Sequence, residues 1–283
     1  MTPNNNLSVL PFYDSINKQN HRKDYAFGEI FPLTVPDRRV LPFQIIRPTS
    51  PESIIGVKLV NLSTGDRVGI LEALGSALTI NRFETEGYDI IQCNNILPMN
   101  INTPEGQYYL ELDDGVQYFY SEVFCIVRNT DNYLTLEYGD EEDLIFEGGR
   151  VCYADGFRFR VYLPTQLGRP DYEFSEQVDD RDGYKFIEKQ ISEKTYKFNF
   201  TAPEYLCDAM RLVRMSDYVT VTNKGDSYNV DSFLMTPTWL EGGYLAKVEC
   251  EFQCDTVIKK LGRASGSEIP NFNNDFNNDF NKN

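Results

Sequence analysis

The sequence predicts a mainly β protein built of two β-sandwich-type domains, with one short helix packed on the second domain. Its length of 283 residues fits two domains, since a domain usually has roughly 100 to 200 residues. Hydrophobic residues make up 41% of the chain, and the 18 Tyr and 19 Phe favour strands because flat rings pack well on a pleated surface. Runs with a period of two recur along the chain, whereas within the two predicted domains one stretch has helical spacing.

The first domain is predicted over residues 31–128, as short strands separated by turns rich in Pro, Gly and Asn. The candidate strands are VLPFQII, SIIGVKLV, ALTI, YDIIQC, YYLEL and VQYFYSEVFCIV. The last two flank Asp113, Asp114 and Gly115, and Asp-Gly supplies the positive φ that a tight hairpin turn requires. Strands at this spacing are typical of an immunoglobulin-like or fibronectin-like sandwich.

The second β domain is predicted over residues 129–263, after the linker RNTDN. In FRFRVYL, TYKFNF and YLAKVECEFQC, apolar and polar residues alternate, which is the pattern of a strand with one buried face. YVTVT and SYNVDSFLM flank the turn NKGD and predict a further hairpin.

One helix is predicted near residues 203–215, in APEYLCDAMRLVRMSD. Pro203 suits the first helical position, where its missing N–H group costs nothing. Leu206, Met210 and Val213 recur at i, i+4 and i+7, so we expect an apolar stripe that lies on a sheet.

Both ends of the chain carry aromatic residues among polar ones, without a sustained period. Residues 1–30 are predicted to form an N-terminal arm whose rings either pack along the body of the subunit or dock on a neighbour. Residues 264–283 are predicted to be an Asn- and Phe-rich flexible tail, either a disordered end or a docking peptide that orders on assembly. The interface candidates on these two segments are Phe12, Tyr13, Tyr25, Phe27, Phe272, Phe276 and Phe280.

The acidic composition argues against two classes of partner. The chain has 27 Lys and Arg against 43 Asp and Glu, a net charge of −16, which repels nucleic acid phosphates and anionic lipid headgroups. The sequence contains neither a signal-like N-terminal stretch nor an apolar run long enough to span a membrane. We therefore expect synthesis in the cytoplasm, with no direct nucleic acid and no membrane as partners.

The residues needed for common catalytic and metal sites are scarce, so we expect no enzyme, no catalytic residue, no cofactor and no metal. The one histidine, His21, falls in the predicted arm, which argues against a catalytic triad or a His-bearing zinc site. Six scattered cysteines predict free, mostly buried thiols. The acidic runs GDEED and VDDRDG are interpreted as solvated turns, with a loose calcium site as the alternative. Paired carboxylates of a β-sandwich hydrolase leave no pattern in a single sequence, and that class stays open.

Three stretches resemble a known class of proteins. They are VQYFYSEVFCIV, RPDYEFSEQVDDRDGYKFIEKQISEKTYKFNFTAPEYLCDAMRLVRMSDYVTV and TWLEGGYLAKVECEFQCDTVIKKLGR, all within residues 110–263. In overall pattern they are similar to virion or tail structural proteins of phages and prophages of Bacteroides-type bacteria, including the crAss-like group. The resemblance carries no active-site residues, and it implies assembly into a tail, ring or baseplate layer of a virion.

The first functional hypothesis is therefore a non-enzymatic structural component of a phage particle, at the portal vertex or tail. Its partners would be further copies of itself, as a homo-oligomeric ring or layer, and neighbouring virion proteins. The alternative is a carbohydrate-binding or adhesive β-sandwich module, in which tyrosines stack on sugar rings.

Overall fold

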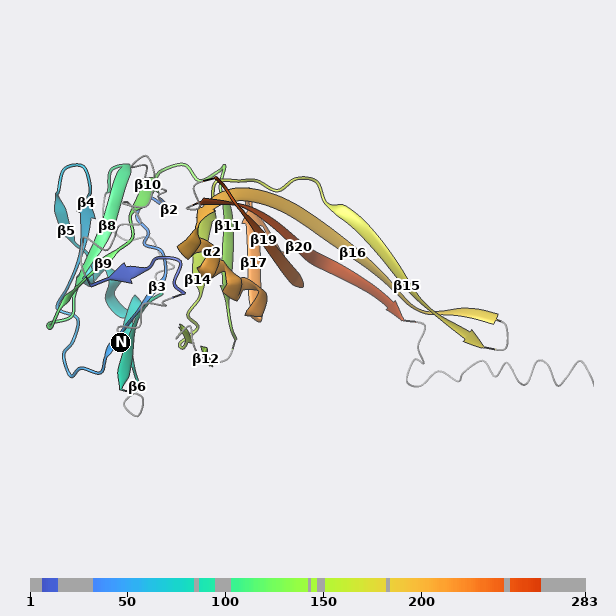
Figure 1. Cartoon of the computed structure of the whole chain (residues 1–283), viewed down its shortest axis with the longest axis horizontal. Coiled ribbons are helices and arrows are strands. Elements are labelled where there is room, and N and C mark those ends of the chain that lie inside the picture. The colour runs from blue at the N-terminus through green and yellow to red at the C-terminus, as the bar shows by residue number, and fades with distance from the viewer. Residues whose placement is uncertain are drawn as a thin grey trace, which may run out of the picture.

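The fold is mainly β, as predicted, with several sheets and two short α-helices among the residues that the structure describes. A computed structural model describes residues 7–14, 33–83, 87–94, 103–141, 144–146, 151–181, 184–241 and 245–260. A compact β body occupies one end of the molecule, and a long β ribbon projects from it (Figure 1). This arrangement is consistent with a β-sandwich-type fold that carries an extension.

The largest sheet has eleven strands and runs through most of the body. Its main path is β1 (Phe12–Tyr13), β9 (Tyr118–Ser121), β8 (Gly106–Asp113), β10 (Phe124–Val127), β2 (Leu33–Pro36), β14 (Phe159–Leu163), β11 (Leu134–Gly139), β17 (Tyr218–Asn223) and β18 (Asp226–Asn229). Two further strands, β4 (Gly56–Asn61) and β5 (Arg67–Gly69), extend it beside β8.

Three smaller sheets complete the β structure of the described residues. One contains β3 (Phe43–Pro48), β7 (Tyr88–Cys93) and β6 (Leu78–Phe83), and another contains β12 (Leu144–Phe146) and β13 (Val151–Tyr153). The third has the order β15 (Asp171–Arg181), β16 (Tyr184–Pro203), β20 (Leu245–Lys260) and β19 (Ser232–Trp239). This four-stranded sheet contributes both to the body and to the projecting ribbon.

The eleven-stranded sheet crosses the predicted boundary between residues 31–128 and 129–263. Strand β2 pairs in parallel with β10 on one side and meets β14 at Thr34 and Tyr162 on the other. One cluster of buried side chains likewise contains residues from both predicted domains, among them Phe43 and Phe159. The division into two domains stays a prediction, and the two parts share a sheet and a core.

Both predicted hairpin turns are confirmed. Gly115 has a φ of 81°, and the Asp114 N–H donates to the Gln117 carbonyl at 3.2 Å, which closes the turn between β8 and β9. Lys224 and Gly225 have φ values of 53° and 91°, as a two-residue turn with positive φ at both positions requires. Two expected strands are interrupted: VQYFYSEVFCIV forms β9 and β10, and SYNVDSFLM forms β18 and the start of β19 in a different sheet.

The predicted helix exists and buries its apolar stripe. It consists of α2 (Glu204–Met210) and a 3-10 turn, Arg211–Met215, and its residues Leu206, Met210 and Val213 are all buried. Pro203 precedes the helix as its N-cap residue in an extended conformation, so placing it at the first helical position was wrong. The sequence pattern also missed α1 (Leu71–Leu74), which is followed by a 3-10 turn over Gly75–Ala77.

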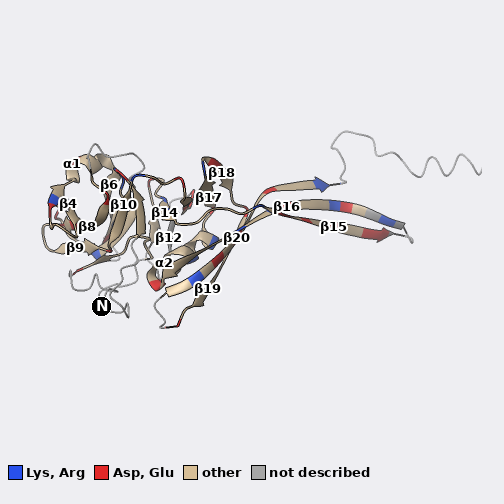
Figure 2. Cartoon of the chain, turned by 90° about the horizontal axis from the view of Figure 1, so that it is seen from above, with Lys and Arg blue, Asp and Glu red and all other residues tan. Residues whose placement is uncertain are grey.

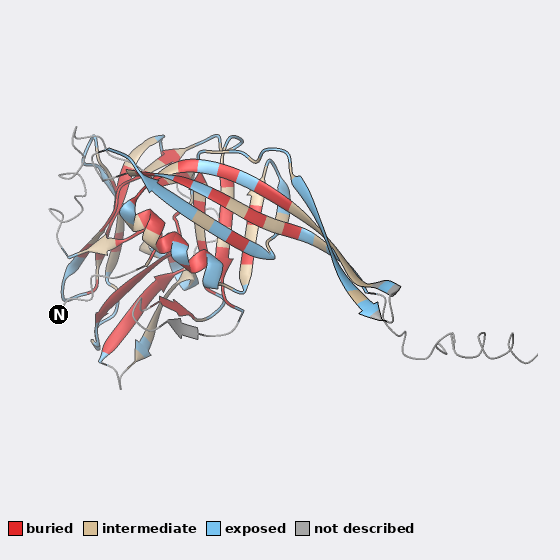
Figure 3. Ribbon diagram, turned by 45° about the vertical axis from the view of Figure 1, so that its right-hand side comes forward, coloured by how far each residue is buried: buried red, intermediate tan, exposed pale blue. Residues whose placement is uncertain are grey.

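The stripe of α2 packs under the four-stranded sheet, whose strands alternate as predicted. Figure 3 shows buried and exposed residues alternating along β16 and β20 where they cover the body. The buried face carries Tyr196, Phe198, Phe200, Ala246, Val248, Cys250, Phe252 and Cys254. This face and the helix enclose one end of the main core.

The structure differs from the predicted N-terminal arm over residues 7–14. Val9 and Leu10 are completely buried in the main core, and β1 pairs Phe12 with Ser121 and Tyr13 with Tyr120. The Phe12 ring lies 4.7 Å from the Phe43 ring, centroid to centroid. This segment is part of the body because its apolar side chains find a place in the core, a contact over long sequence distance that has no local pattern.

Candidate interaction surface

The projecting ribbon is formed by three antiparallel strands. Strand β16 has 20 residues, which at about 3.3 Å per residue spans roughly 65 Å. Its C-terminal half pairs with β20 over the body, and its N-terminal half pairs with β15 and the end of β20 beyond the body (Figure 1). The two ladders each contain one register shift and otherwise pair residue by residue, and this pairing holds the distal part of the ribbon away from the core.

One face of the ribbon is a continuation of the face that is buried in the body. Directly paired residues of an antiparallel ladder share a face, and every second residue returns to it. Tyr196 and Phe198 are buried, and two and four residues before Tyr196 this same face carries Lys194 and Ser192. Ser192 pairs with Phe174 of β15 and with Val257 of β20, so these two side chains extend the core face beyond the core.

Apolar side chains on the ribbon are exposed to an extent that is unusual for their size. Phe174 is 78% exposed, Val257 65% and Tyr172 63%. Val178 on this face and Ile258 on the opposite face are also exposed. A concentration of large exposed apolar groups on one extension is typical of a protein interaction surface.

The two outer strands of the ribbon carry opposite charges. Strand β15 contains five acidic residues and one basic residue in DYEFSEQVDDR, whereas β20 ends in Lys259 and Lys260. Figure 2 shows red near the end of β15 and blue at the end of β20. The ribbon is therefore acidic along one edge and basic at the end of the other.

An aromatic cluster with one ammonium group lies at the root of the ribbon. The Tyr196 ring lies 5.0 Å from the Tyr228 ring and 5.5 Å from the Phe252 ring, centroid to centroid. Lys194 Nζ lies 5.3 Å from the Tyr196 centroid and 3.3 Å from Asp255 Oδ2. Hydrogen bonding to Tyr196 and then to Asp255 raises the pKa of Lys194, against the effect of burial. These contacts join the β17–β18 hairpin to the ribbon and favour a fixed direction for it.

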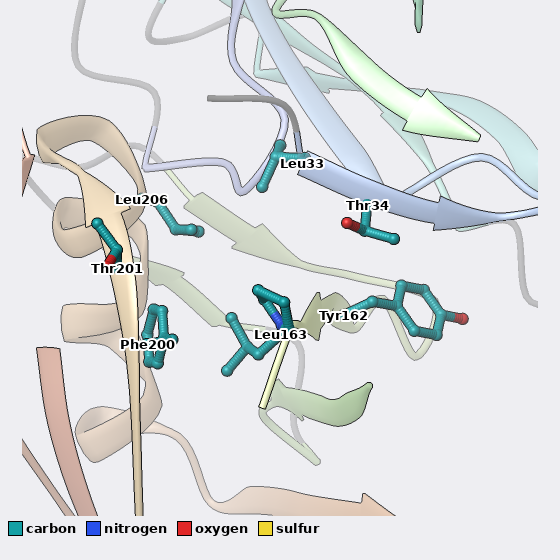
Figure 4. Close-up of a pocket in the computed structure, with 8 residues that line it drawn as sticks. Leu33, Thr34, Tyr162, Leu163, Phe200, Thr201 and Leu206 are labelled. Carbon is teal, nitrogen blue, oxygen red and sulfur yellow. The ribbon is translucent and has the colours of Figure 1, made fainter. Parts of the chain in front are cut away.

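A small cavity at the junction of the two predicted domains has too little room for a substrate. Figure 4 shows the residues around it: Leu33 and Thr34 of β2, Tyr162 and Leu163 of β14, Phe200 and Thr201 of β16, and Leu206 of α2. Its volume of about 20 Å³ is enough for about one water molecule, whereas ligand pockets have roughly 300 to 1,000 Å³.

A larger hollow of about 410 Å³ lies over the outer face of the four-stranded sheet. Its lining combines charged and polar side chains with one aromatic ring, Phe198, which is buried on the other face of the sheet. Sugar rings stack on exposed aromatic faces, and this lining provides none.

The cysteines have the properties of structural thiols. All six are thiols outside any disulfide, and five of them are buried, as predicted. Burial raises the pKa of Cys207 to about 11, with a smaller effect of Asp208, and burial followed by Glu105 raises the pKa of Cys125. Because the thiolate is the nucleophilic form, these two groups are unreactive near neutral pH.

A buried cluster of three charges joins the three-stranded sheet of β3, β7 and β6 to the main sheet. Arg47 Nη1 lies 2.9 Å from Asp114 Oδ2, and Arg47 Nη2 lies 3.5 Å from Asp89 Oδ2. Burial by itself raises the pKa of Asp114, but hydrogen bonds from the Gln117 N–H, Arg47 and the Val116 N–H hold it below its ordinary value. The cluster has the composition of a structural ion network, in which the guanidinium compensates two buried carboxylates.

The predicted interface residues are only partly placed. Phe12 and Tyr13 lie half-buried on the body, which is the first of the two alternatives for the arm rings. The other candidates, Tyr25, Phe27, Phe272, Phe276 and Phe280, are outside the described residues, as is His21. Sequence reasoning missed Tyr172, Phe174 and Val257, although Tyr172, Phe174 and Val178 alternate with polar residues in DYEFSEQVDDR.

Neither a metal site nor a membrane span occurs in the part of the chain that the structure describes. There, His, Cys, Asp and Glu side chains form no group of three or more that could hold a metal ion. The described helices include none long and apolar enough to cross a membrane. Val178–Arg181 of the second acidic run ends strand β15 instead of forming a turn.

No protein-family model and no curated protein sequence matches this chain.

Proposed function

We propose that this protein is a non-enzymatic structural component of a phage particle, in a tail, ring or baseplate layer, and that it acts by protein-protein assembly. The observation that carries the proposal is the ribbon, which extends exposed apolar side chains such as Phe174 and Val257 away from the body. Such a ribbon gains stability by being covered, because burying apolar surface contributes about 25 cal/mol per Å².

Two further observations support a role through surfaces. The small cavity between β2, β14, β16 and α2 holds about one water molecule, and burial raises the pKa of thiols such as Cys207, so neither supplies a reactive centre. The resemblance of residues 110–263 to phage structural proteins supports a particle as the place of assembly, and this stretch includes the entire ribbon.

The experiment that tests this role is mass spectrometry of phage particles purified by density-gradient centrifugation from a bacterium that carries the gene. Peptides of this chain are expected in the DNA-filled fraction, in a constant ratio to the other particle proteins across the gradient. Their absence from that fraction, with the protein present in the lysate, would contradict the proposal. A parallel run on a deletion of the gene identifies particles that form without it.

A further inference from the structure

The ribbon has two strand edges that pair with no other strand in the described parts of the chain. Strand β15 lies at the edge of its sheet and pairs only with β16. On the other side, the β19 ladder ends where Ser232 meets Gln253, so Val257–Lys260 of β20 pair with β16 alone. Open edges of this kind present rows of N–H and C=O groups that are a template for pairing with another chain.

The charges on these two edges select which edges pair. Two β15 edges would bring Glu173 and Glu176 against further carboxylates, and like charges directly opposite are destabilising. The end of β20 presents Lys259 and Lys260, which attract the acidic edge. Charge repulsion therefore disfavours pairing between two β15 edges, and charge attraction favours pairing of β15 with the end of β20.

Residues that pair across β15, β16 and β20 form rows across the ribbon, and the same row reaches both edges. Phe174 and Val257 share the row of Ser192, and Glu176 and Lys259 share the row of Gln190. Strands β15 and β20 are both antiparallel to β16, so they run in the same direction. Two copies can therefore lie side by side with their ribbons parallel and their rows aligned. Phe174 of one copy then lies beside Val257 of the next, and Glu176 lies beside Lys259 of the next.

We propose that neighbouring copies of this chain pair ribbon to ribbon, with β15 of one copy against residues 257–260 of β20 of the next. The inference rests on the proposed function and names its partner as a second copy. Each copy uses two different edges, so the contact is heterologous, and it repeats to form a ring or an open filament. Pairing is in parallel, and it combines main-chain hydrogen bonds with one apolar row and one charged row.

Charge reversal in the full-length chain tests the pairing. Sedimentation velocity at low salt is expected to show wild-type oligomers, and Glu176→Lys or Lys259→Glu to weaken association by about tenfold or more, because each puts like charges in contact. The double variant, and an equal mixture of the two single variants, are expected to associate like the wild type. Lys224→Glu, in the exposed turn after β17, is the matched control. Unchanged association of both single variants, or a wild type that is monomeric throughout, would overturn the inference.

Disulfide cross-linking tests the head-to-tail geometry independently. Gln177 and Lys260 share the row of Lys189 but lie two strand spacings apart, about 9.5 Å, which is beyond the reach of a disulfide within one copy. Oxidation of the Gln177→Cys, Lys260→Cys chain is expected to give a ladder of trimers and larger species, and each single variant none. A ladder that stops at dimers, or equal cross-linking of one single variant, would overturn it. Melting temperatures equal to that of the wild type, measured in reducing buffer at a concentration where every protein is monomeric, establish that all variants are folded.

The two proposals fail separately. If the chain is present in particles but charge reversal does not change its association, the ribbon pairing is wrong and the particle role stands. A chain that pairs as described but is missing from purified particles would overturn the particle role alone.

Discussion

Arg47 Nη1 lies 2.9 Å from Asp114 Oδ2, with the two side chains 1% and 2% exposed. The pair connects β3 of the three-stranded sheet to the turn between β8 and β9 of the main sheet. Asp89 of β7 lies against the same guanidinium, and Arg47 also donates to the Glu52 carbonyl at 2.7 Å. One cation thus compensates two buried carboxylates and joins two sheets.

Replacing this cation is expected to destabilise the fold strongly. Arg47→Met leaves Asp89 and Asp114 buried without a counter-charge, which costs about 3 to 5 kcal/mol. Urea unfolding at neutral pH measures the change. Arg67→Met is the control, because that side chain is 55% exposed and its pairing with Glu111 contributes about 0 to 1 kcal/mol. Equal stability of the two variants would contradict a structural role for the cluster.

The stability of the protein is expected to fall in acid, in part through Asp114. Its pKa is lower in the folded protein than its ordinary value, so the charged form contributes stability above about pH 4, which is lost as the pH falls through the folded pKa. Asp114→Asn is expected to lower stability at pH 7 and to reduce the stability that is lost as the pH falls below about 4. Asp140→Asn is the control, since burial raises the pKa of that group. If stability falls with pH in Asp114→Asn as it does in the wild type, Asp114 does not contribute to the loss of stability in acid.

The stripe of α2 is expected to be a core element. Met210 is 1% exposed, and Met210→Ala should cost about 2 to 5 kcal/mol because it leaves a cavity under the four-stranded sheet. Met215→Ala, at a side chain that is 58% exposed, should change stability by no more than about 0.5 kcal/mol. Thermal unfolding of both variants compares them, and wild-type melting of Met210→Ala would show that the helix does not support the sheet.

The predicted domain boundary can be tested by limited proteolysis. The first stable cut is expected in the exposed turn near Asp131, between β10 and β11. Because β2 pairs with both β10 and β14, we expect the two fragments to remain together in size-exclusion chromatography and to separate only in denaturant. A first cut deep inside either half, near Gly56 or Tyr218, would mean that the division is wrong.

The strands of the body could be predicted because apolar and polar residues alternate locally. Features that depend on contacts between distant parts of the chain could not be predicted. Phe159, Val161 and Leu163 alternate with polar residues because one face of β14 meets the core and the other does not. The burial of Val9 and Leu10 depends on distant partners, so no neighbouring residue indicates it. The Arg47 cluster has the same character, because its charges come from three separate parts of the chain.

The ribbon was hidden for a different reason. Beyond the body neither of its faces is buried, so charged residues mix with apolar ones and the period of two weakens along β15. TYKFNF predicted only the part of β16 that covers the core, although the strand continues from Tyr184 to Pro203. Alternation records burial within one chain, and a surface that is covered only on assembly leaves a weaker pattern.

The exposed apolar row of the ribbon is expected to drive association, so the Phe174→Ser, Val257→Ser variant should lose association in sedimentation velocity. Both side chains are exposed in a single copy, so at a concentration where every protein is monomeric the melting temperature should equal that of the wild type. Val116→Ser, at a 69% exposed position in the turn between β8 and β9, is the control for removing apolar surface elsewhere. Oligomers are expected for the wild type and the control, and monomers for the ribbon variant. The same distribution of oligomers in all three proteins would contradict this expectation.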